Sequence, residues 1–553
     1  MKNADLIVAL LKAAGIRRGF GVPSGNVLPL MDAMRVGGID FVLTAHEGSA
    51  GFAADVSARM SGVPGLCIAT LGPGATNLTT GVGCAYLDRS PLIAITCNLN
   101  QPQLGRRIQM WIDHAALFKP ITKASFTLRP GSIAATVAEA LRLALTEPQG
   151  PVHLDLPEDV AVAEVSEAVT PHLNRPPQGG RTGLPSPSTG KGQGGGVTKA
   201  AEILSRARRP LAVIGASAMR MRHHDTLREF VERHQTPFAT TTMAKGLIDE
   251  AHPLAIGCIE RAKRQLQRRF IHDNADLIIG LGYDTIEVEY EAWIGKLPVL
   301  HVDTGRADVD ASVTIAHEVV GDLDAAISAL ASLPASSNDW HRMGETHQPN
   351  ALEHHRTAFH RALRPATSHF SPHEAIDVVR RVLPREGVLA FDVGAHTHQI
   401  ASQWTAHAPR TFLITNGWSS MGFGLPAAIA AKLERPTLPV ACIVGDGCFQ
   451  MTCGELAVAQ RERLAIPFVV LNDRWLSLIK VKQERRSLEH YGTALSFERS
   501  DVAPPAHYFG VPAVGAGTSA ELEARLVQAL RADGPTVIEV EVDPAHYSET
   551  VYD

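Results

Sequence analysis

The chain has 553 residues, which at roughly 100–200 residues per domain corresponds to three to five domains. Hydrophobic residues make up 45% of the sequence and charged residues 20%, and 57 acidic side chains against 52 basic ones give a net charge of −5. This composition excludes wholesale disorder, collagen and coiled coil, and the weak acidity disfavours general binding to nucleic acid or anionic membrane.

The cellular setting is predicted from what the sequence lacks. It contains no apolar run long enough to cross a bilayer, and its first residues have the pattern of an amphipathic helix rather than a signal peptide. The seven cysteines are scattered without a CxxC pair, which favours buried hydrophobic side chains over a zinc site or a disulfide framework. We therefore expect a cytoplasmic protein with no membrane partner.

The first block covers residues 1–165. Apolar segments at residues 41–44, 65–70, 92–96 and 152–156 have the character of buried strands, and helical patterns lie between them. Strand–helix alternation of this kind predicts a parallel sheet with helices on both faces. Residues 166–196 are rich in proline and glycine and are predicted to be a linker.

The second block covers residues 197–335. Buried strands are predicted at residues 211–215, 277–281 and 299–303, with glycines at their ends, as in a Rossmann-like sheet. The full GxGxxG spacing is missing, so these glycines are weak evidence for a nucleotide. Residues 336–368 are polar and rich in histidine; we expect a solvated linker there rather than a metal cluster.

The third block covers residues 369–553. Ser371, Pro372 and Glu374 form a capping box with proline at the first helical position, which predicts the start of a helix. Strands are predicted at residues 388–392, 411–415, 440–444, 468–471 and 537–542, and a helix at residues 454–463. The predicted fold is α/β, with three doubly wound parallel-sheet domains.

The strongest chemical signal lies in the third block. Gly445-Asp446-Gly447 follows one predicted strand, and the next strand ends at Asn472-Asp473, so that the two aspartates are 27 positions apart. A strand–helix–strand unit of that length brings both carboxylates to the same edge of a parallel sheet. Two oxygen ligands there suit Mg²⁺, and the glycines allow backbone N–H groups to approach a diphosphate.

This signature resembles that of the thiamine-diphosphate enzymes of the acetohydroxyacid synthase and pyruvate decarboxylase superfamily, and the resemblance covers nearly the whole chain. It implies a pyrimidine-binding, a middle and a diphosphate-binding domain. It also implies that Asp446, Asp473 and the carbonyl of Trp475 bind Mg²⁺, with Cys448 and Leu476 beside the cofactor. Asp473 departs from the commoner asparagine and adds a negative charge.

Other segments extend the resemblance. Glu47 follows the first predicted strand and corresponds to the carboxylate that hydrogen-bonds the aminopyrimidine and activates the cofactor. The remaining positions that the resemblance assigns to cofactor binding lie in loops: Pro23, Gly25, Thr70, Gly74, Asn77, Gly394, His396, Ser419, Met421, Gly445 and Gly447. Met421 would hold the cofactor in its bent form. Because the family pairs domains from different subunits, a homodimer or homotetramer with sites at subunit interfaces is expected.

The substrate is less well determined. Residues 113–123 resemble the corresponding segment of catabolic, FAD-independent acetolactate synthases, whereas the middle domain of biosynthetic relatives binds FAD; the glycines leave FAD undecided. His114 is a candidate proton shuttle or a structural histidine. Gln109 lies one position before Met110, where the family usually has glutamine. Lys482, followed by Gln483, occupies the position of a specificity tryptophan and would favour an anionic substrate or remain solvated.

The resemblance implies decarboxylation of a 2-oxo acid and carboligation of the product to an acceptor carbonyl, as in acetolactate synthase. A related decarboxylase, lyase or acyltransferase acting on another anionic acid, of the sulfoacetaldehyde or oxalyl type, is the alternative. The pair Arg106-Arg107 would bind such an anion or be a solvated pair. A catalytically inactive, cofactor-binding paralogue is the third hypothesis.

Overall fold

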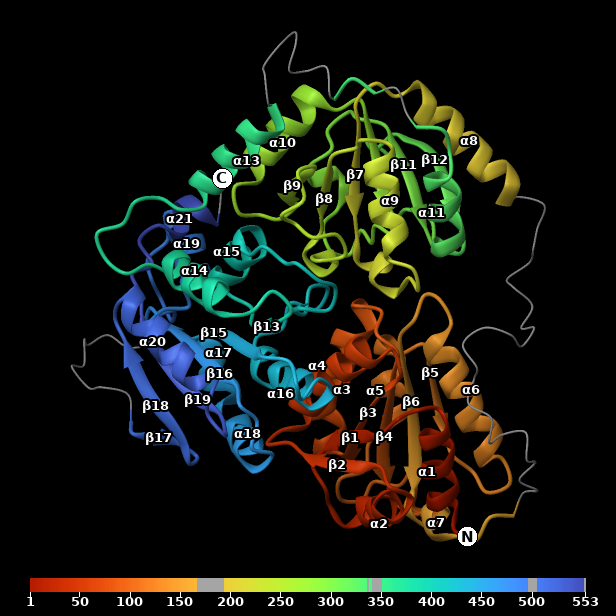
Figure 1. Cartoon of the computed structure of the whole chain (residues 1–553). Coiled ribbons are helices and arrows are strands. Elements are labelled where there is room, and N and C mark those ends of the chain that lie inside the picture. The colour runs from red at the N-terminus through yellow and green to blue at the C-terminus, as the bar shows by residue number, and fades with distance from the viewer. Residues whose placement is uncertain (167–192, 336–337, 341–350, 496–504, 552–553) are drawn as a thin grey trace.

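A computed structural model describes residues 1–166, 193–335, 338–340, 351–495 and 505–551. Most of the predicted linker 166–196 therefore lies outside the described residues. The described chain forms three α/β domains, each built on one sheet with helices on both faces (Figure 1). None of the described helices is long and apolar enough to cross a membrane.

The first domain has a six-stranded parallel sheet in the order β2-β1-β3-β4-β6-β5. Its strands are β1 (Arg18–Gly21), β2 (Asp40–Leu43), β3 (Gly65–Thr70), β4 (Leu92–Asn98), β5 (Ala124–Thr127) and β6 (Pro151–Pro157). Its helices are α1 (Asn3–Ala13), α2 (Leu28–Gly37), α3 (Glu47–Ser61), α4 (Pro73–Leu87), α5 (His114–Phe118), α6 (Ile133–Leu145) and α7 (Glu158–Val162).

The middle domain has a six-stranded parallel sheet in the order β12-β11-β10-β7-β8-β9. Its strands are β7 (Pro210–Ile214), β8 (Phe238–Thr240), β9 (Ala255–Cys258), β10 (Leu277–Leu281), β11 (Val299–Asp303) and β12 (Ile315–Val320). Its helices are α8 (Gln193–Arg206), α9 (Asp225–Arg233), α10 (Arg264–Asn274), α11 (Leu323–Ala331) and, packed against α10 and β9, α13 (Ala351–Ala362).

The third domain has a seven-stranded sheet, β14-β13-β15-β16-β19-β18-β17, in which only the edge strand β17 is antiparallel. Its strands are β13 (Val388–Phe391), β14 (Phe412–Leu413), β15 (Val440–Gly445), β16 (Pro467–Asn472), β17 (His507–Tyr508), β18 (Val511–Ala516) and β19 (Thr536–Glu541). Its helices are α14 (Pro372–Val382), α15 (Ala395–Gln403), α16 (Gly424–Glu434), α17 (Asp446–Thr452), α18 (Leu456–Arg461), α19 (Ser477–Arg485), α20 (Ser519–Ala529) and α21 (Tyr547–Thr550).

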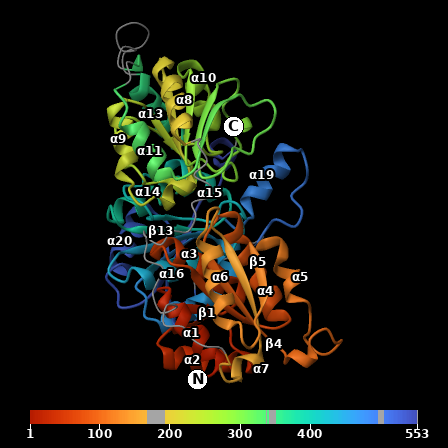
Figure 2. The ribbon, with the colours of Figure 1, turned by 90° about the vertical axis from the view of Figure 1, so that its right-hand side faces the viewer.

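The first and third domains are joined by the small-residue helices α3, α4 and α16, which lie together between the two sheets in both ribbon views (Figures 1 and 2). A Cβ added at Gly51 of α3 would lie 2.6 Å from the Cα of Gly81 on α4, so these helices touch backbone to backbone. Phe52 of α3 packs edge-on against Phe423 at the start of α16, at 5.6 Å between ring centroids. One hydrophobic core therefore spans both domains.

The prediction of three doubly wound domains is confirmed, with local differences. Strands β1 and β5 carry little apolar pattern and were not predicted, and the strand expected at residues 411–415 is reduced to β14. The helix predicted at 454–463 is a 3₁₀ turn, Cys453–Glu455, followed by α18. Residues 351–362 form helix α13, where a solvated linker was expected, because His355 and Phe359 bury against the middle domain.

The His355 ring contacts side chains of the middle domain. Its Nε2 atom lies 2.8 Å from the Gln267 side-chain oxygen, and its ring stacks on Phe270 at 4.2 Å. His354 and His360 are exposed on other faces of α13, and part of the histidine-rich segment lies outside the described residues. Six of the seven cysteines are buried and all are free, as predicted.

Candidate active site

The two aspartates predicted as metal ligands lie at the ends of neighbouring strands. β15 and β16 pair in parallel, with Gly445 opposite Leu471, so Asp446 and Asp473 leave the same edge of the sheet. Asp446 is the first residue of α17, and its carboxylate accepts hydrogen bonds from the backbone N–H groups of Gly447 and Arg474, both at 2.8 Å. This arrangement fixes the carboxylate orientation before any ligand binds.

Asp473 is held in the same way: its carboxylate accepts from the Trp475 N–H at 2.9 Å and from the Ser477 hydroxyl at 2.7 Å. Burial and the neighbouring Asp473 raise the pKa of Asp446 to about 7, and burial raises the pKa of Asp473 to about 6. Two partly buried carboxylates disfavour each other's negative charge, and a hard divalent cation bound between them would remove this repulsion. The residues therefore fit such a cation.

A buried histidine points to an anion next to these carboxylates. His396, on the first turn of α15, is 4% exposed, and its Nε2 atom has no hydrogen-bond partner in the described structure. A Cβ added at Gly394 or Gly445 would lie 2.8 or 3.1 Å from the His396 ring, so both glycines leave space around it. An unpartnered buried ring nitrogen between two glycine loops fits the oxygen of a bound phosphate group.

The loop that carries Met421 is fixed by Asp392. This fully buried carboxylate accepts from the N–H groups of Gly422 at 2.9 Å and Gly424 at 2.8 Å. The Met421 Cε atom and the Leu476 side chain then both lie against Gly447, at 3.5 and 2.7 Å from the position of a Cβ there. The structure thus brings Met421, Gly447 and Leu476 together.

Glu47 anchors the other half of the candidate site. It begins α3, is 8% exposed, and its Oε2 atom accepts a hydrogen bond of 3.0 Å from Asn77 on α4. A Cβ added at Gly74 would lie 3.3 Å from Glu47 Oε1 and 2.7 Å from Thr70, which itself accepts from Ser24. Glu47, Thr70, Gly74 and Asn77 therefore lie side by side.

Glu455, which the sequence analysis did not identify as a site residue, is 1% exposed at the end of the 3₁₀ turn in the third domain. Its carboxylate accepts hydrogen bonds from the N–H groups of Ala45 and His46, each at 3.1 Å, immediately before Glu47. Glu455 thus ties the third domain to the loop that presents Glu47. Only the contact between distant segments reveals this role; a glutamate at a helix start is otherwise unremarkable.

His114 lies behind the glycine turn. Its Nε2 atom accepts from the Gly72 N–H at 3.4 Å, and its Nδ1 atom lies 2.9 Å from both Asp155 and Thr96. Gly72 has φ +58°, and a Cβ there would lie 2.5 Å from the carbonyl oxygen of Met110. Both ring nitrogens of His114 are engaged by protein atoms, which favours a structural role over proton transfer.

The expected substrate residues are more open. Gln109 and Met110 are exposed, and so are Arg106 and Arg107. Gln483, on α19, is tied within its own segment: it donates to the Tyr491 carbonyl at 3.1 Å and accepts from Thr493 at 3.0 Å.

Lys482 is half-buried, and no carboxylate partner for it is found among the described residues. The neighbouring Lys480 lies over the Trp475 ring at 5.2 Å. Pro23 and Trp475 are half-buried, Gly25 and Ser419 are exposed, and Cys448 is buried, donating to the Val393 carbonyl at 3.0 Å. These contacts do not assign the residues a ligand.

The sequence matches three family models, each described as a domain of thiamine pyrophosphate enzymes: the N-terminal TPP-binding domain at residues 1–117, the central domain at 197–330 and the C-terminal TPP-binding domain at 392–540. Each matched segment lies within one of the three domains described above.

Similar proteins include the probable acetolactate synthase large subunit of Methanocaldococcus jannaschii, 30% identical over 99% of this chain and 92% of that protein. The acetolactate synthase of Arthrospira platensis is 30% identical over 98% of this chain and 94% of that protein. The acetolactate synthase isozyme 2 large subunit of Escherichia coli K12 is 29% identical, over 98% and 96%. The chain therefore belongs to the thiamine pyrophosphate enzymes, in the family of the acetolactate synthase large subunits.

Proposed function

We propose that this protein is a thiamine-diphosphate- and Mg²⁺-dependent enzyme that decarboxylates a 2-oxo acid and joins the product to an acceptor carbonyl, in the manner of acetolactate synthase. The observation that carries the proposal is the paired site at the ends of β15 and β16. Asp446 and Asp473 are held by local donors, and His396 has a free nitrogen next to them. The similar proteins named acetolactate synthase support the reaction type.

The third domain would hold the charged end of the cofactor. Asp446, Asp473 and the Trp475 carbonyl would bind Mg²⁺, which neutralises the diphosphate as well as the two carboxylates. Gly394 and Gly445 would admit the phosphate oxygens, and His396 Nε2 would donate to one of them. When bound, thiamine diphosphate supplies the carbon nucleophile of the reaction; the protein supplies orientation and electrostatics.

The first domain would hold the pyrimidine ring. Glu47 would hydrogen-bond a ring nitrogen and keep a proton there, and its carboxylate is already oriented by Asn77. Glu47 is held by Asn77 and lies against Gly74, both in its own domain. Because the resemblance implies domains paired from different subunits, the third domain that completes this site would come from a second subunit.

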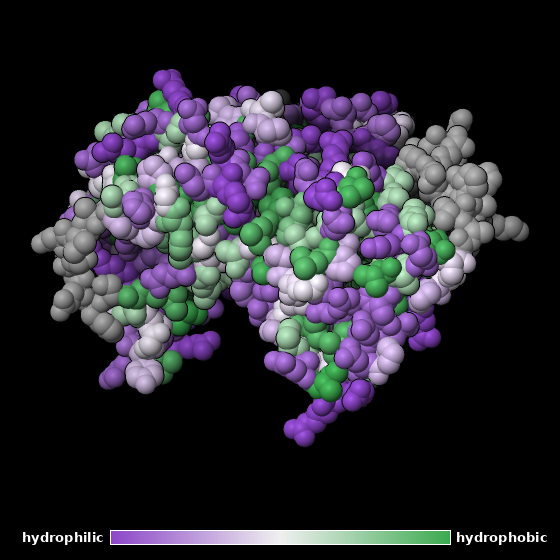
Figure 3. Space-filling model, turned by 90° about the horizontal axis from the view of Figure 1, so that it is seen from below, coloured by the Kyte–Doolittle hydropathy of each residue, from purple (hydrophilic) through white to green (hydrophobic). Residues whose placement is uncertain are grey.

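Exposed apolar side chains also favour such a homodimer or homotetramer. Leu28, Leu43 and Met110 of the first domain and Trp418 and Met451 of the third are at least one-third exposed. Apolar patches lie near the recess of the face in Figure 3. Burial of such side chains at a subunit contact would stabilise the assembly.

A panel of 2-oxo acids tests the proposal. The protein is incubated with thiamine diphosphate and Mg²⁺, CO₂ release is measured for each acid, and products are identified by mass spectrometry. We expect pyruvate to yield CO₂ and acetolactate. Turnover of a sulfonated or oxalyl acid instead would assign the chain to the related reactions on other anions, and a complete lack of turnover would favour an inactive, cofactor-binding paralogue.

A further inference from the structure

The middle domain has the strand order at which dinucleotides bind. In the sheet β12-β11-β10-β7-β8-β9, the order reverses between β7 and β10, and a dinucleotide phosphate would lie at the carboxyl ends of these two strands. The middle domain of biosynthetic acetolactate synthases binds FAD, as stated above. FAD can bind here only if the ends of β7 and β10 leave room for its diphosphate.

The loops that follow β7 and β10 are already in contact. The Ser217 N–H donates to the Gly282 carbonyl at 3.0 Å. A Cβ added at Gly215 would lie 2.5 Å from the Cα of Tyr283, and one at Gly282 would lie 2.5 Å from the Ala218 nitrogen. These glycines therefore bring the chain close to itself, which leaves no gap for a phosphate between the two loops.

The donors at this edge are satisfied by Glu287. Its carboxylate accepts from the Ala216 N–H at 2.9 Å, the Met243 N–H at 2.8 Å and the Thr241 hydroxyl at 2.6 Å. The first two N–H groups belong to 3₁₀ turns after β7 and β8, the places where a phosphate would be bound. Burial raises the pKa of Glu287 to about 7 against the opposing effect of these donors, so the site is best tested at higher pH.

The segment that carries Glu287 is itself fixed by packing. Tyr283 stacks on Tyr290 at 4.2 Å, and the Trp293 indole donates to the Tyr283 hydroxyl at 3.0 Å. All three aromatic side chains are at most 1% exposed. Glu287 is thus held in place by an aromatic cluster and is not a mobile side chain that a ligand would simply displace.

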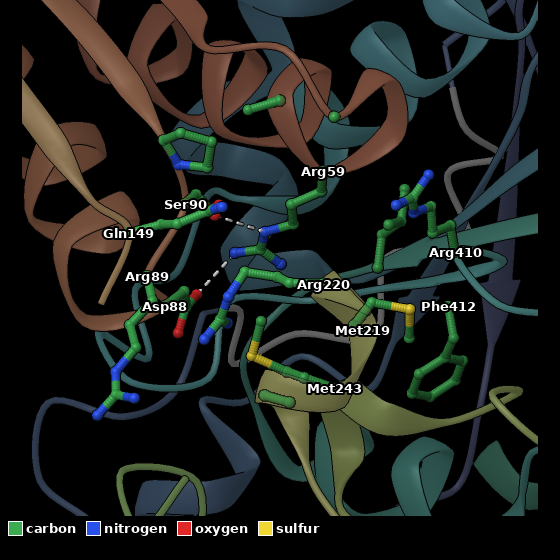
Figure 4. Close-up of a pocket in the computed structure, with 15 residues that line it drawn as sticks. Arg59, Asp88, Arg89, Ser90, Gln149, Met219, Arg220, Met243, Arg410 and Phe412 are labelled. Atoms are coloured by element: carbon green, nitrogen blue, oxygen red, sulfur yellow. Dashed lines mark hydrogen bonds and ion pairs between the residues drawn. The ribbon is translucent and has the colours of Figure 1, made fainter. Parts of the chain in front are cut away.

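A small pocket lies beside these loops. A pocket of about 150 Å³ lies between the three domains, lined by Ala216, Met219, Arg220 and Met243 of the middle domain and by residues of the other two (Figure 4). Ligand sites are typically roughly 300–1,000 Å³.

Most of the arginines that line this pocket are already paired. Arg59 pairs with Asp55 and Asp88, Arg89 with Asp284, and Arg220 with Glu147. Among the pocket arginines in the described part of the chain, Arg410 alone has no carboxylate partner, and it lies on the far side of the pocket from Asp88 (Figure 4). Most of the positive charge that could bind a flavin diphosphate is therefore already neutralised by carboxylates of the protein.

We propose that the Glu287 carboxylate occupies the phosphate position of the middle domain and that this chain works without FAD. The consequence is that the flavin of biosynthetic relatives has no counterpart here, and that the middle domain is stabilised from within. The inference does not depend on the proposed function, because flavin content is measured without turnover.

The test uses the full-length protein at pH 8. It is incubated with excess FAD, Mg²⁺ and thiamine diphosphate and desalted, and flavin is measured by absorption and by fluorescence after heat release. Isothermal titration calorimetry with FAD covers weaker binding. We expect no flavin above background and no binding heat; one flavin per chain, or saturable FAD binding, would overturn the proposal.

Variants test the role of Glu287 itself. We expect Glu287→Ala to lower the melting temperature clearly, whereas Glu289→Ala, at an exposed position two residues away, leaves it unchanged. If Glu287→Ala does not fold, Glu287→Gln, which keeps one acceptor oxygen, should fold but melt at a lower temperature than the wild type. Equal melting of the Glu287 and Glu289 variants would show that Glu287 does not fill this position.

Discussion

Glu455 offers a direct test of how the third domain positions Glu47. In the Glu455→Ala variant, the N–H groups of Ala45 and His46 lose their acceptor at a site where Glu455 is 1% exposed. A hydrogen bond to a charged group contributes about 1.5–3 kcal/mol, so the loss of two such bonds should lower the free energy of unfolding by about 3 kcal/mol after partial relaxation. Glu455→Gln keeps one acceptor oxygen, and we expect about half of that loss.

The effect of the Glu455→Ala substitution on catalysis shows whether Glu455 positions Glu47 or only stabilises the fold. Loss of these bonds frees the loop before Glu47, and a displacement of about 1 Å at a reacting group can cost on the order of 10²-fold in rate. We therefore expect the folded Glu455→Ala enzyme to lose kcat far more than KM. The exchange of the C2 proton of bound thiamine diphosphate with D₂O should slow as well.

Urea unfolding and the exchange rate are measured on the same preparations. Glu462→Ala is the matched control, because Glu462 is exposed just beyond the same helix and should change neither quantity. A folded Glu455→Ala enzyme with unchanged kcat and C2 exchange would refute the positioning role.

Three further predictions concern the cofactor half. Asp446→Ala should abolish Mg²⁺ and thiamine-diphosphate binding in calorimetry, and unchanged binding would remove Asp446 from the ligand set. Because the pKa values of Asp446 and Asp473 are raised to about 7 and about 6, protons compete with the metal: Mg²⁺ affinity should fall as pH falls through 7 to 6. The raised pKa values also mean that, between about pH 4 and 7, the folded metal-free protein binds more protons than the unfolded chain, so its stability should fall as pH rises through this range. Mg²⁺ should restore the lost stability. Melting curves measured against pH, with and without Mg²⁺, check both effects. Met421→Ala should lower kcat with little change in the melting temperature, because Met421 is only partly buried; an unchanged kcat would argue against its role in holding the cofactor.

Local patterns were enough to predict the site elements that follow buried strands. Strand β15 and the Gly445-Asp446-Gly447 turn could be predicted because a continuous apolar run followed by glycines is a strong local signal. Glu47 is different: it follows the short, partly exposed strand β2 and begins helix α3, and only the resemblance singles it out. The resemblance to thiamine-diphosphate enzymes then assigned Glu47 and the Asp446 turn to one cofactor site. The spacing of these residues in the sequence could not do so.

Features that depend on distant contacts could not be predicted. Glu455 and Ala45 are far apart in the sequence, and no local sequence pattern predicts their hydrogen bond. The residues of helix α13 are mostly polar, and for that reason a linker was predicted there. The helix is instead stabilised by the burial of His355 and Phe359 against the middle domain. Likewise, the glycines after β7 and β10 were only weak evidence for a nucleotide, and their role in bringing two loops together is visible only in the structure.

We propose that Glu47 activates thiamine diphosphate for the decarboxylation of a 2-oxo acid. The most direct measurement compares CO₂ release from pyruvate, with saturating thiamine diphosphate and Mg²⁺, by the wild-type protein and by the Glu47→Gln variant, with cofactor binding measured in parallel. We expect the Glu47→Gln variant to retain the fold and bind the cofactor but to have almost no turnover. Near-normal turnover in that variant would contradict it.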